Sequence, residues 1–133
     1  MRKTVKLFKA LSDENRVRIL KMLETRGLYV CEITEVLLLA FSTVSKDLSI
    51  LRDAGFVIDV KEGRWVRYRL NRESDDPCVQ EVLDMLARWL PTDEADTLEL
   101  ARILSCRTER RCQSENLLAE MFDGQSLYQY EDK

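Results

Sequence analysis

The sequence contains no histidine among its 133 residues and only four glycines and two prolines. Without histidine, neither a Ser-His-Asp nor a Cys-His catalytic arrangement can form. The four glycines are scattered, so there is no glycine-rich phosphate-binding loop, and no Cys-x-x-Cys pair is present. These absences predict that the protein is not an enzyme and holds no permanent cofactor.

Long apolar runs are also missing. The longest, Val36 to Phe41, is far shorter than the roughly 20 residues needed to cross a bilayer. The Met-Arg-Lys start leads directly into an amphipathic segment rather than into a signal peptide. We therefore expect a cytoplasmic protein with no membrane partner. In that reducing compartment the four cysteines are expected to be ligands, sensors or core side chains rather than disulfides.

Charge is divided unevenly along the chain, although the net charge is only −3. Residues 1–72 contain fifteen Lys or Arg and nine Asp or Glu, whereas residues 73–133 contain six and fifteen. A cationic first half suits binding to nucleic-acid phosphates, and an acidic remainder favours solubility and weakens binding to non-cognate DNA. The hydrophobic content of 45% is enough for one core.

Apolar residues at helical spacing predict four helices in the first part of the chain. The first ends near Leu11, and Ser12 is the expected N-cap of the second, which stops before Gly27. A short third helix is predicted from about Val30 to Leu38. The fourth runs from Phe41 to Ala54 and is ended by a glycine at the following position.

The period changes to two between Phe56 and Leu70, which predicts two strands joined at Glu62-Gly63-Arg64. The return strand carries Arg67 and Arg69 beyond that tip. Two short helices, a turn and then a hairpin define a winged helix-turn-helix. We therefore predict a mainly α fold with a small β-hairpin wing.

Two amphipathic segments flank this unit and predict a homodimer. Pro77 suits the first turn of a helix that runs to Leu90, and a sixth helix opens at Thr92 with Leu98, Ala101 and Leu104 at helical spacing. The helix from Pro77 and the first helix each have an apolar stripe that could pair with a second copy. Residues 1–90 are thus expected to form the DNA-binding and dimerisation domain, and residues 91–133 a helical extension with a polar tail.

The expected DNA-reading helix has hydroxyls and a cation on one side and Val44, Leu48 and Leu51 on the other. Two-fold symmetry would place two such helices about one DNA turn apart, on an inverted-repeat operator. Asp47 is less suited to this surface, and it could either accept a hydrogen bond from cytosine N4 or pair with a neighbouring cation. The predicted groove contacts are Ser42, Thr43, Ser45 and Lys46, and the predicted phosphate contacts are Arg16, Ser49, Arg64 and Arg67.

Several separate motifs resemble the ArsR/SmtB family of bacterial metalloregulatory repressors. They are Ala-Leu-Ser-Asp-Glu-Asn-Arg-Val-Arg-Ile-Leu at 10–20, Val-Cys-Glu-Ile at 30–33, Ser-Thr-Val-Ser-Lys-Asp-Leu-Ser-Ile-Leu-Arg-Asp-Ala-Gly at 42–55, and Gly-Arg at 63–64. The match covers roughly residues 3–90. This resemblance implies a homodimeric repressor that leaves its operator when a soft ion binds.

Two departures from the family narrow the effector. Arsenite-responsive members often have Cys-Val-Cys at the start of the third helix, and here the first of these positions is Tyr29, which leaves only Cys31. Members that sense zinc, nickel or cobalt use histidines, which this chain lacks, so we expect no such site. Cysteine thiolates are the soft ligands that the chain still offers. Three of them suit As(III) or Sb(III), the inducer that we expect.

The cysteines are not equivalent. Cys31 lies at a helix start, where amide dipoles favour the thiolate, and three cations lie between Cys106 and Cys112. We expect these three thiols to form the metalloid site, with capture of the ion shifting the third helix and the reading helix. Cys78 follows Pro77 at a helix start and is interpreted as a small buried side chain, outside the site.

Two alternatives remain open from the sequence. Two cysteines could instead form a reversible bond, which would make the protein a thiol redox or persulfide sensor of the same fold. The acidic second half also permits a winged helix that binds proteins instead of DNA, although the arginines on the expected wing count against this.

Overall fold

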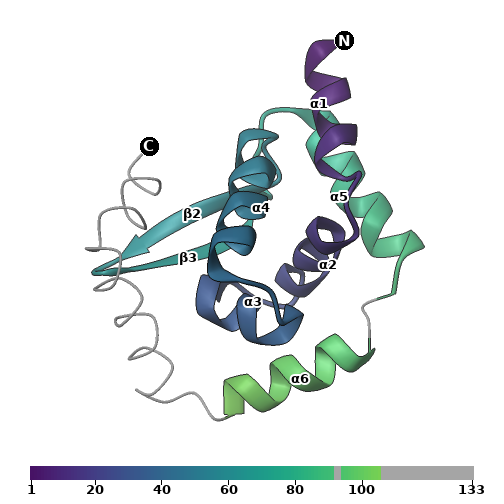
Figure 1. Cartoon of the computed structure of the whole chain (residues 1–133). Helices are drawn as coiled ribbons and strands as arrows, with labels where there is room; N and C mark the ends of the chain where they lie inside the picture. The colour runs from purple at the N-terminus through teal and green to yellow at the C-terminus, as the bar shows by residue number, and fades with distance from the viewer. Residues whose placement is uncertain (92–93, 106–133) are drawn as a thin grey trace.

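The structure is a computed structural model, and it describes residues 1–91 and 94–105. The rest of the predicted helical extension, residues 106–133 with the polar tail, lies outside these residues. The helices and strands are arranged as a helical body from which a hairpin projects (Figure 1). In chain order they are α1 (Arg2–Ala10), α2 (Glu14–Leu23), β1 (Leu28–Tyr29), α3 (Val30–Leu37), α4 (Phe41–Asp53), β2 (Val57–Glu62), β3 (Trp65–Leu70), α5 (Pro77–Trp89) and α6 (Glu94–Ser105).

The start of α2 differs by one residue from the sequence prediction. Asp13, and not Ser12, is the N-cap, since its side chain accepts a hydrogen bond from the Arg16 amide at 3.2 Å. The Ser12 hydroxyl instead donates to the Lys9 carbonyl at 2.7 Å and so closes the last turn of α1. Either side chain can cap a helix, and the tight turn after α1 determines which one does.

Helices α3 and α4 form the helix-turn-helix, and the turn between them is sharp. Leu38 is the C-cap of α3 and adopts a left-handed conformation with φ of 57°, while its side chain is 87% exposed. Such a conformation costs a residue with a Cβ about 1–2 kcal/mol. The helix predicted to reach Leu38 therefore ends at Leu37, and the turn begins earlier than the apolar run suggested.

The sheet has three strands where the sequence predicted a two-stranded hairpin. Strands β2 and β3 pair antiparallel with Glu62 opposite Trp65, and β1 adds to the other edge of β3 with Tyr29 opposite Arg67. The strand order is therefore β1-β3-β2. Sequence periodicity could not reveal β1, because two residues are too few to show alternation.

The core lies between α2, the inner face of α4 and the inner face of the sheet. Three apolar side chains of α4, those of Val44, Leu48 and Leu51, are fully buried, as the sequence pattern predicted. Phe56, directly before β2, and Tyr68 of β3 are buried in the same core. Burying a side chain of this size stabilises the fold by about 1.5–3 kcal/mol, so this packing fixes how α4 is presented.

Two polar links attach the C-terminal helices to α2. The Lys21 ammonium group is buried and donates both to the Leu86 carbonyl of α5 at 3.0 Å and to Glu24 at 2.9 Å. Arg18 donates two hydrogen bonds to the buried carboxylate of Asp96 on α6, at 2.6 and 3.0 Å. These links join the helices that flank the helix-turn-helix into one body.

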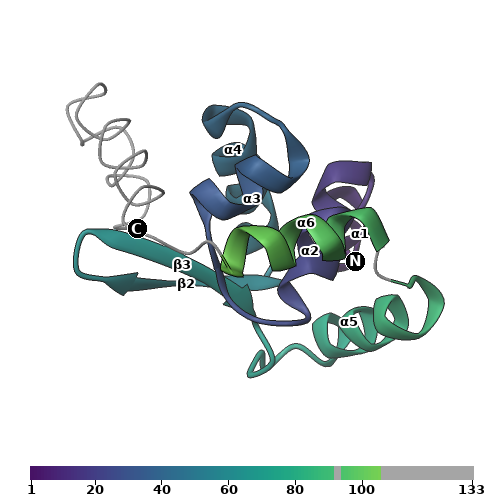
Figure 2. The ribbon, with the colours of Figure 1, turned by 90° about the horizontal axis from the view of Figure 1, so that it is seen from below.

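Helix α6 crosses the face formed by α2 and α3 (Figure 2). The predicted sixth helix is present from Glu94, but its inward face differs, since Leu100 and Ile103 are buried whereas Leu98 is 69% exposed. The prediction from the apolar spacing of Leu98 chose the wrong face because one of the inward residues, Asp96, is charged and is paired with Arg18. Within the described residues, no helix is long and apolar enough to span a membrane.

Candidate nucleic-acid interface

The outer face of α4 is polar and accessible. Ser42, Thr43 and Lys46 are exposed, and Ser45 and Ser49 are half-buried. The N-cap, Ala40, has no side-chain acceptor, so amide groups of the first turn have no side-chain cap. Free amides, hydroxyls and an ammonium group are the groups that contact phosphates and base edges in a DNA groove.

Asp47 faces inward and is not part of this outer face. Its carboxylate accepts a hydrogen bond from Arg16 at 3.2 Å, and only 7% of the residue is exposed. Burial raises the pKa of Asp47, while the hydrogen bond from Arg16 acts in the opposite direction. Of the two possibilities that the sequence left open for Asp47, the structure shows the pair with a neighbouring cation.

Arg16 joins three elements through its guanidinium group. Besides the bond to Asp47 on α4, it donates to the carbonyls of Ala10 at 2.7 Å and Lys9 at 3.2 Å, at the end of α1. A guanidinium with several protein acceptors is held in one orientation. Arg16 thus connects α1, α2 and α4, which is a more internal position than a phosphate contact requires.

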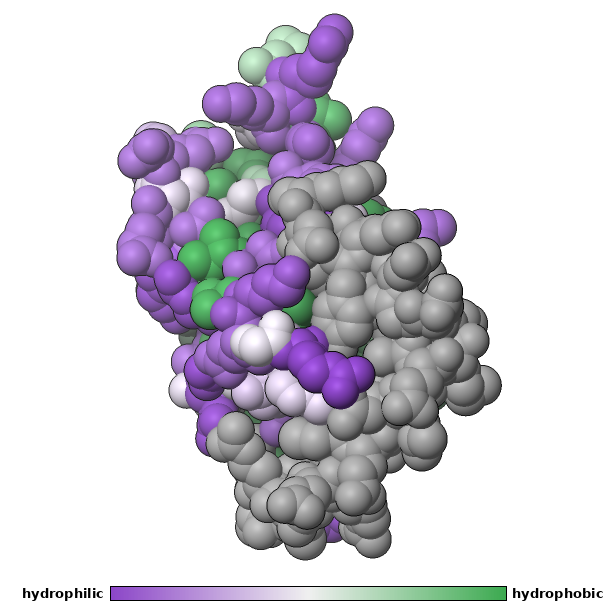
Figure 3. All heavy atoms as spheres, turned by 90° about the vertical axis from the view of Figure 1, so that its left-hand side faces the viewer, coloured by the Kyte–Doolittle hydropathy of each residue, from purple (hydrophilic) through white to green (hydrophobic). Residues whose placement is uncertain are grey.

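The wing projects from the body beside α4. Its tip residue Arg64 is exposed, and no partner for it is found within residues 1–91 and 94–105. At the base of the wing, Arg52 of α4 pairs with Asp59 of β2 at 3.1 Å, which ties the wing to the reading helix. On the side from which the wing projects, the described surface is mostly hydrophilic (Figure 3).

Arg67 differs from Arg64 because it has partners within the protein. Its guanidinium group pairs with Glu62, and its Cζ atom lies 6.0 Å from the centre of the Tyr29 ring. The hydrogen bond to Glu62 raises the pKa of Arg67. The strand register could have indicated the pairing with Glu62, whereas nothing in the sequence indicated Tyr29.

Only one of the three predicted thiol ligands lies in the described part of the chain. Cys31 is buried in the first turn of α3, with 8% of its surface exposed, and its carbonyl accepts the Thr34 hydroxyl at 2.7 Å. Cys106 and Cys112 lie outside the described residues, within which no group of metal-binding side chains is found. However, α6 packs against α3 and ends at Ser105, directly before Cys106.

Cys78 does not match the interpretation as a buried side chain. It is exposed at the start of α5, where its amide donates to the Asp76 carboxylate at 2.9 Å. A residue in the first turn of a helix can point outward or inward, so the neighbouring proline does not predict whether Cys78 is buried. The thiol lines one end of a groove between α1 and α5.

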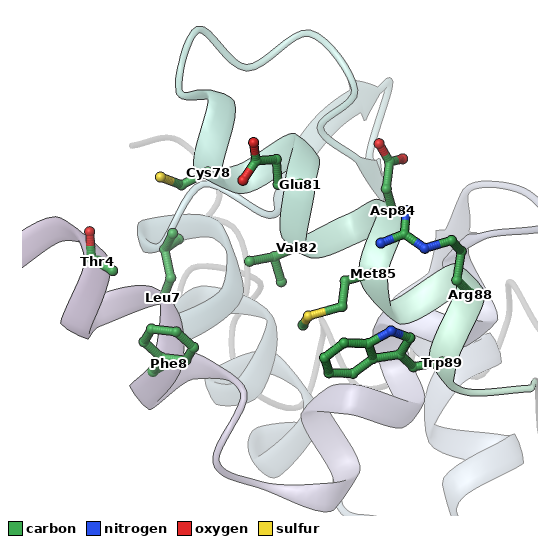
Figure 4. Close-up of a pocket in the computed structure, with 10 residues that line it drawn as sticks. All are labelled: Thr4, Leu7, Phe8, Cys78, Glu81, Val82, Asp84, Met85, Arg88 and Trp89. Carbon is green, nitrogen blue, oxygen red and sulfur yellow. The ribbon is translucent and has the colours of Figure 1, made fainter.

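That groove has a volume of about 490 Å³ and is mainly apolar (Figure 4). Phe8 of α1 and Trp89 of α5 are 61% and 69% exposed on its walls, and Val82 and Met85 lie between them. A contiguous apolar surface of this kind in a small protein usually marks an interface. It is formed by the two helices for which the sequence predicted pairing with a second copy.

A helix-turn-helix with a polar reading helix and an attached wing defines a winged-helix DNA-binding protein. The sequence profile described as "Bacterial regulatory protein, arsR family" matches residues 13–59. The arsenic resistance transcriptional regulator ArsR1 of Pseudomonas putida is 36% identical over 98 residues, which cover 71% of this chain and 77% of the relative. The chain therefore belongs to the ArsR family and is a transcriptional repressor of the winged-helix type.

Two further comparisons agree with this assignment. The arsenical resistance operon repressor of Bacillus subtilis is 36% identical over 89 residues, covering 66% of this chain and 85% of that protein. The solved structure of HlyU from Vibrio cholerae is 35% identical, with a TM-score of 0.57 over 67% of this chain and 92% of HlyU. The resemblance to the ArsR/SmtB family and the winged-helix fold, both predicted from the sequence, are thus confirmed.

Proposed function

We propose that this protein is a homodimeric repressor that holds an inverted-repeat operator and releases it when Cys31, Cys106 and Cys112 bind As(III) or Sb(III). The observation that carries the proposal is the position of Cys31. This thiol lies in the first turn of α3, and the next helix, α4, presents the reading surface. A ligand bound there would act on the helix-turn-helix directly.

The packing of α6 supports a shared thiol site. Helix α6 lies against α3, and the ion pair of half-buried Arg18 with buried Asp96 links it to α2. Because α6 ends at Ser105, the chain reaches Cys106 from a helix already docked on the one that contains Cys31. Relatives named for arsenic resistance add support for a trivalent metalloid, which prefers three sulfur ligands.

The apolar groove between α1 and α5 supports the dimer. Exposed Phe8 and Trp89 would be buried by the same helices of a second copy, since a two-fold axis makes such a surface self-complementary. The axis would then relate two α4 helices and two wings. We propose that Ser42, Thr43, Ser45, Lys46 and Ser49 of α4 contact DNA together with Arg64 of the wing, and we leave out Arg16 and Arg67 because both have internal partners.

Operator release by arsenite tests this proposal. Under reducing conditions, fluorescence anisotropy of labelled operator would be followed during arsenite titration of the parent and of Cys31→Ser, Cys106→Ser and Cys112→Ser. We expect release from the parent and at least a ten-fold loss of arsenite sensitivity in each variant, because a site of three thiolates loses a ligand. Cys78→Ser is the matched control and is expected to respond as the parent does.

Two results would contradict the proposal. If all three variants respond like the parent, the three thiols are not the site. If the parent ignores arsenite but loses two hydrogen masses per cysteine pair after mild oxidation, the protein is a thiol redox sensor.

A further inference from the structure

Three side chains from separate segments meet on the outer face of the sheet. The Tyr29 hydroxyl donates to Glu62 Oε1 at 2.8 Å, and the other oxygen of Glu62 pairs with the Arg67 guanidinium. The guanidinium carbon of Arg67 lies 6.0 Å from the centre of the Tyr29 ring, near the limit of a favourable cation–π contact. Each member of this cluster therefore contacts the other two.

The backbone supports the same arrangement. Tyr29 is paired with Arg67 in the register of β1 and β3, which places their side chains on one face of the sheet. Beneath them, a Cβ added to Gly27 would lie 3.0 Å from Arg67 Cδ and 3.2 Å from the Tyr68 carbonyl oxygen. The stem of Arg67 thus crosses a glycine that leaves room for it, so its path is set by close packing.

The cluster joins two functional parts of the molecule. Tyr29 is the N-cap of α3, its amide donates to Glu32 Oε1 at 2.8 Å, and it precedes Cys31 by two residues. Glu62 is the last residue of β2, next to the tip of the wing. The cluster is therefore a side-chain connection from the first turn of α3 to the wing, in addition to the backbone pairing of β1 with β3.

We propose that Tyr29, Glu62 and Arg67 are positioning residues that fix the wing against the start of α3, so that Arg64 reaches a DNA phosphate. Arg67 then acts through the wing and not as a phosphate contact. The inference deepens the proposed function, and rests on it in one respect, that the wing contacts DNA. In the same scheme, a ligand that moves the first turn of α3 changes the position of the wing.

Neighbouring arginines show why Arg67 is distinct. Arg64 is exposed at the tip with no partner found in the described residues. Arg69 pairs with Glu73 at 3.0 Å, but these side chains are 43% and 71% exposed, and such exposed pairs contribute little. Arg69→Ala is therefore a matched control that removes an arginine from the same strand without touching the cluster.

The dependence of operator affinity on salt distinguishes positioning from phosphate contact. Loss of one phosphate contact lowers the slope of log affinity against log salt by about one. We expect Arg64→Ala to lower the slope in this way. We expect weaker binding, by about three- to ten-fold as for loss of one hydrogen bond, from each of Tyr29→Phe, Glu62→Gln and Arg67→Ala. The slope of log affinity against log salt should stay equal to that of the parent. Arg69→Ala should match the parent.

A double variant tests whether the residues act together. Tyr29→Phe combined with Glu62→Ala should be no weaker than Glu62→Ala alone, because Glu62→Ala already removes the acceptor of the Tyr29 hydroxyl. The proposal is overturned if Arg67→Ala lowers the slope as Arg64→Ala does. Independent, multiplicative effects of the two changes would overturn it as well.

Hydrogen exchange provides a second measurement that needs neither DNA nor metalloid. In the full chain, Tyr29→Phe and Glu62→Gln should each speed exchange of the β2 and β3 amides near the wing tip by several-fold, with α2 amides unchanged. Exchange equal to the parent in both variants would overturn the inference. Failure of the parent to bind DNA would instead count against the proposed function, and the exchange result would still decide the role of the cluster.

Discussion

The outer face of α4 and the groove between α1 and α5 are both exposed, but their chemistry is opposite. On α4 the side chains of Val44, Leu48 and Leu51 are fully buried, and the exposed ones, such as Thr43 and Lys46, are polar. Along the groove the helices also bury one apolar stripe, yet Phe8 and Trp89 remain 61% and 69% exposed. The apolar face of α4 is thus covered within a single chain, whereas the apolar surface of the groove is not.

This difference indicates what each surface binds. A polar helix face has no need of a protein partner and can exchange its water for DNA phosphates and base edges. An exposed aromatic pair gains free energy only when another apolar surface covers it, at about 25 cal/mol for each Å² buried. The proposed function gives DNA to α4 and a second copy of the chain to the groove, and each surface can be tested separately.

The largest effect is expected from a charge placed in the groove. Phe8→Glu would put a carboxylate where the proposed dimer would bury an aromatic ring, and an unpaired buried charge is costly. We expect the protein to sediment as a monomer and its operator affinity to fall by about 100-fold, as for loss of a central interface residue. Analytical ultracentrifugation and anisotropy would measure the two effects.

Leu98→Glu is the matched control for that variant. Leu98 is as exposed as Trp89, at 69%, but it lies on α6 and does not line the groove. This change should leave both sedimentation and operator affinity within two-fold of the parent. Equal effects of the two substitutions would show that the groove has no special role and would remove the contrast between the surfaces.

A smaller effect is expected from the polar surface. Lys46→Ala removes the exposed ammonium group of α4 without touching the buried face, so the fold and the dimer should be unchanged. We expect operator affinity to fall by about ten-fold, as for one good contact to DNA. Arg102→Ala, which removes a cation from α6, is the control and should bind as the parent does. Parent-like binding by Lys46→Ala would argue against α4 as the reading helix.

The smallest effect concerns the boundary between the buried and polar faces of α4. Because burial raises the pKa of Asp47, the folded state takes up a proton there more readily than the unfolded state. The contribution of Asp47 to stability is thus full below the ordinary pKa of 3.8 and is lost as pH rises through the higher folded value. Urea unfolding at several pH values between 4 and 7 would measure it.

Asp47→Asn removes this titration and leaves an oxygen that can still accept from Arg16. The parent should therefore gain stability relative to the variant as the pH falls across that range. A stability difference that is constant with pH, or that changes in the opposite direction, would mean that the bond from Arg16 outweighs burial at this carboxylate.

Periodicity was sufficient to predict most of the fold, because each long element buries one face of a regular repeat. Val44, Leu48 and Leu51 showed the inner face of α4, and alternation from Phe56 to Leu70 showed the hairpin. The failures have local causes. Strand β1 is two residues long, and the inward face of α6 includes Asp96, a carboxylate paired with Arg18 inside the protein.

The functional surface was predicted less completely, because a side chain's type does not reveal its partner. Lys46 and Arg64 are exposed where the sequence placed them, whereas Arg16 and Arg67 have partners that come from other segments of the chain. The bond from Tyr29 to Glu62 spans 33 residues. Contacts of this length depend on the tertiary structure and have no signature in local sequence.

The buried ammonium group of Lys21 has a consequence for the operator itself. Its hydrogen bond holds the end of α5, a helix of the proposed dimer interface, to α2. The dimer interface and the helix-turn-helix therefore belong to one rigid body. A rigid dimer cannot adjust the distance between its two reading helices when the distance between the half-sites changes. Inserting one base pair at the centre turns one half-site by roughly a tenth of a helical turn and lengthens the span, so the repressor should discriminate strongly against such spacing variants.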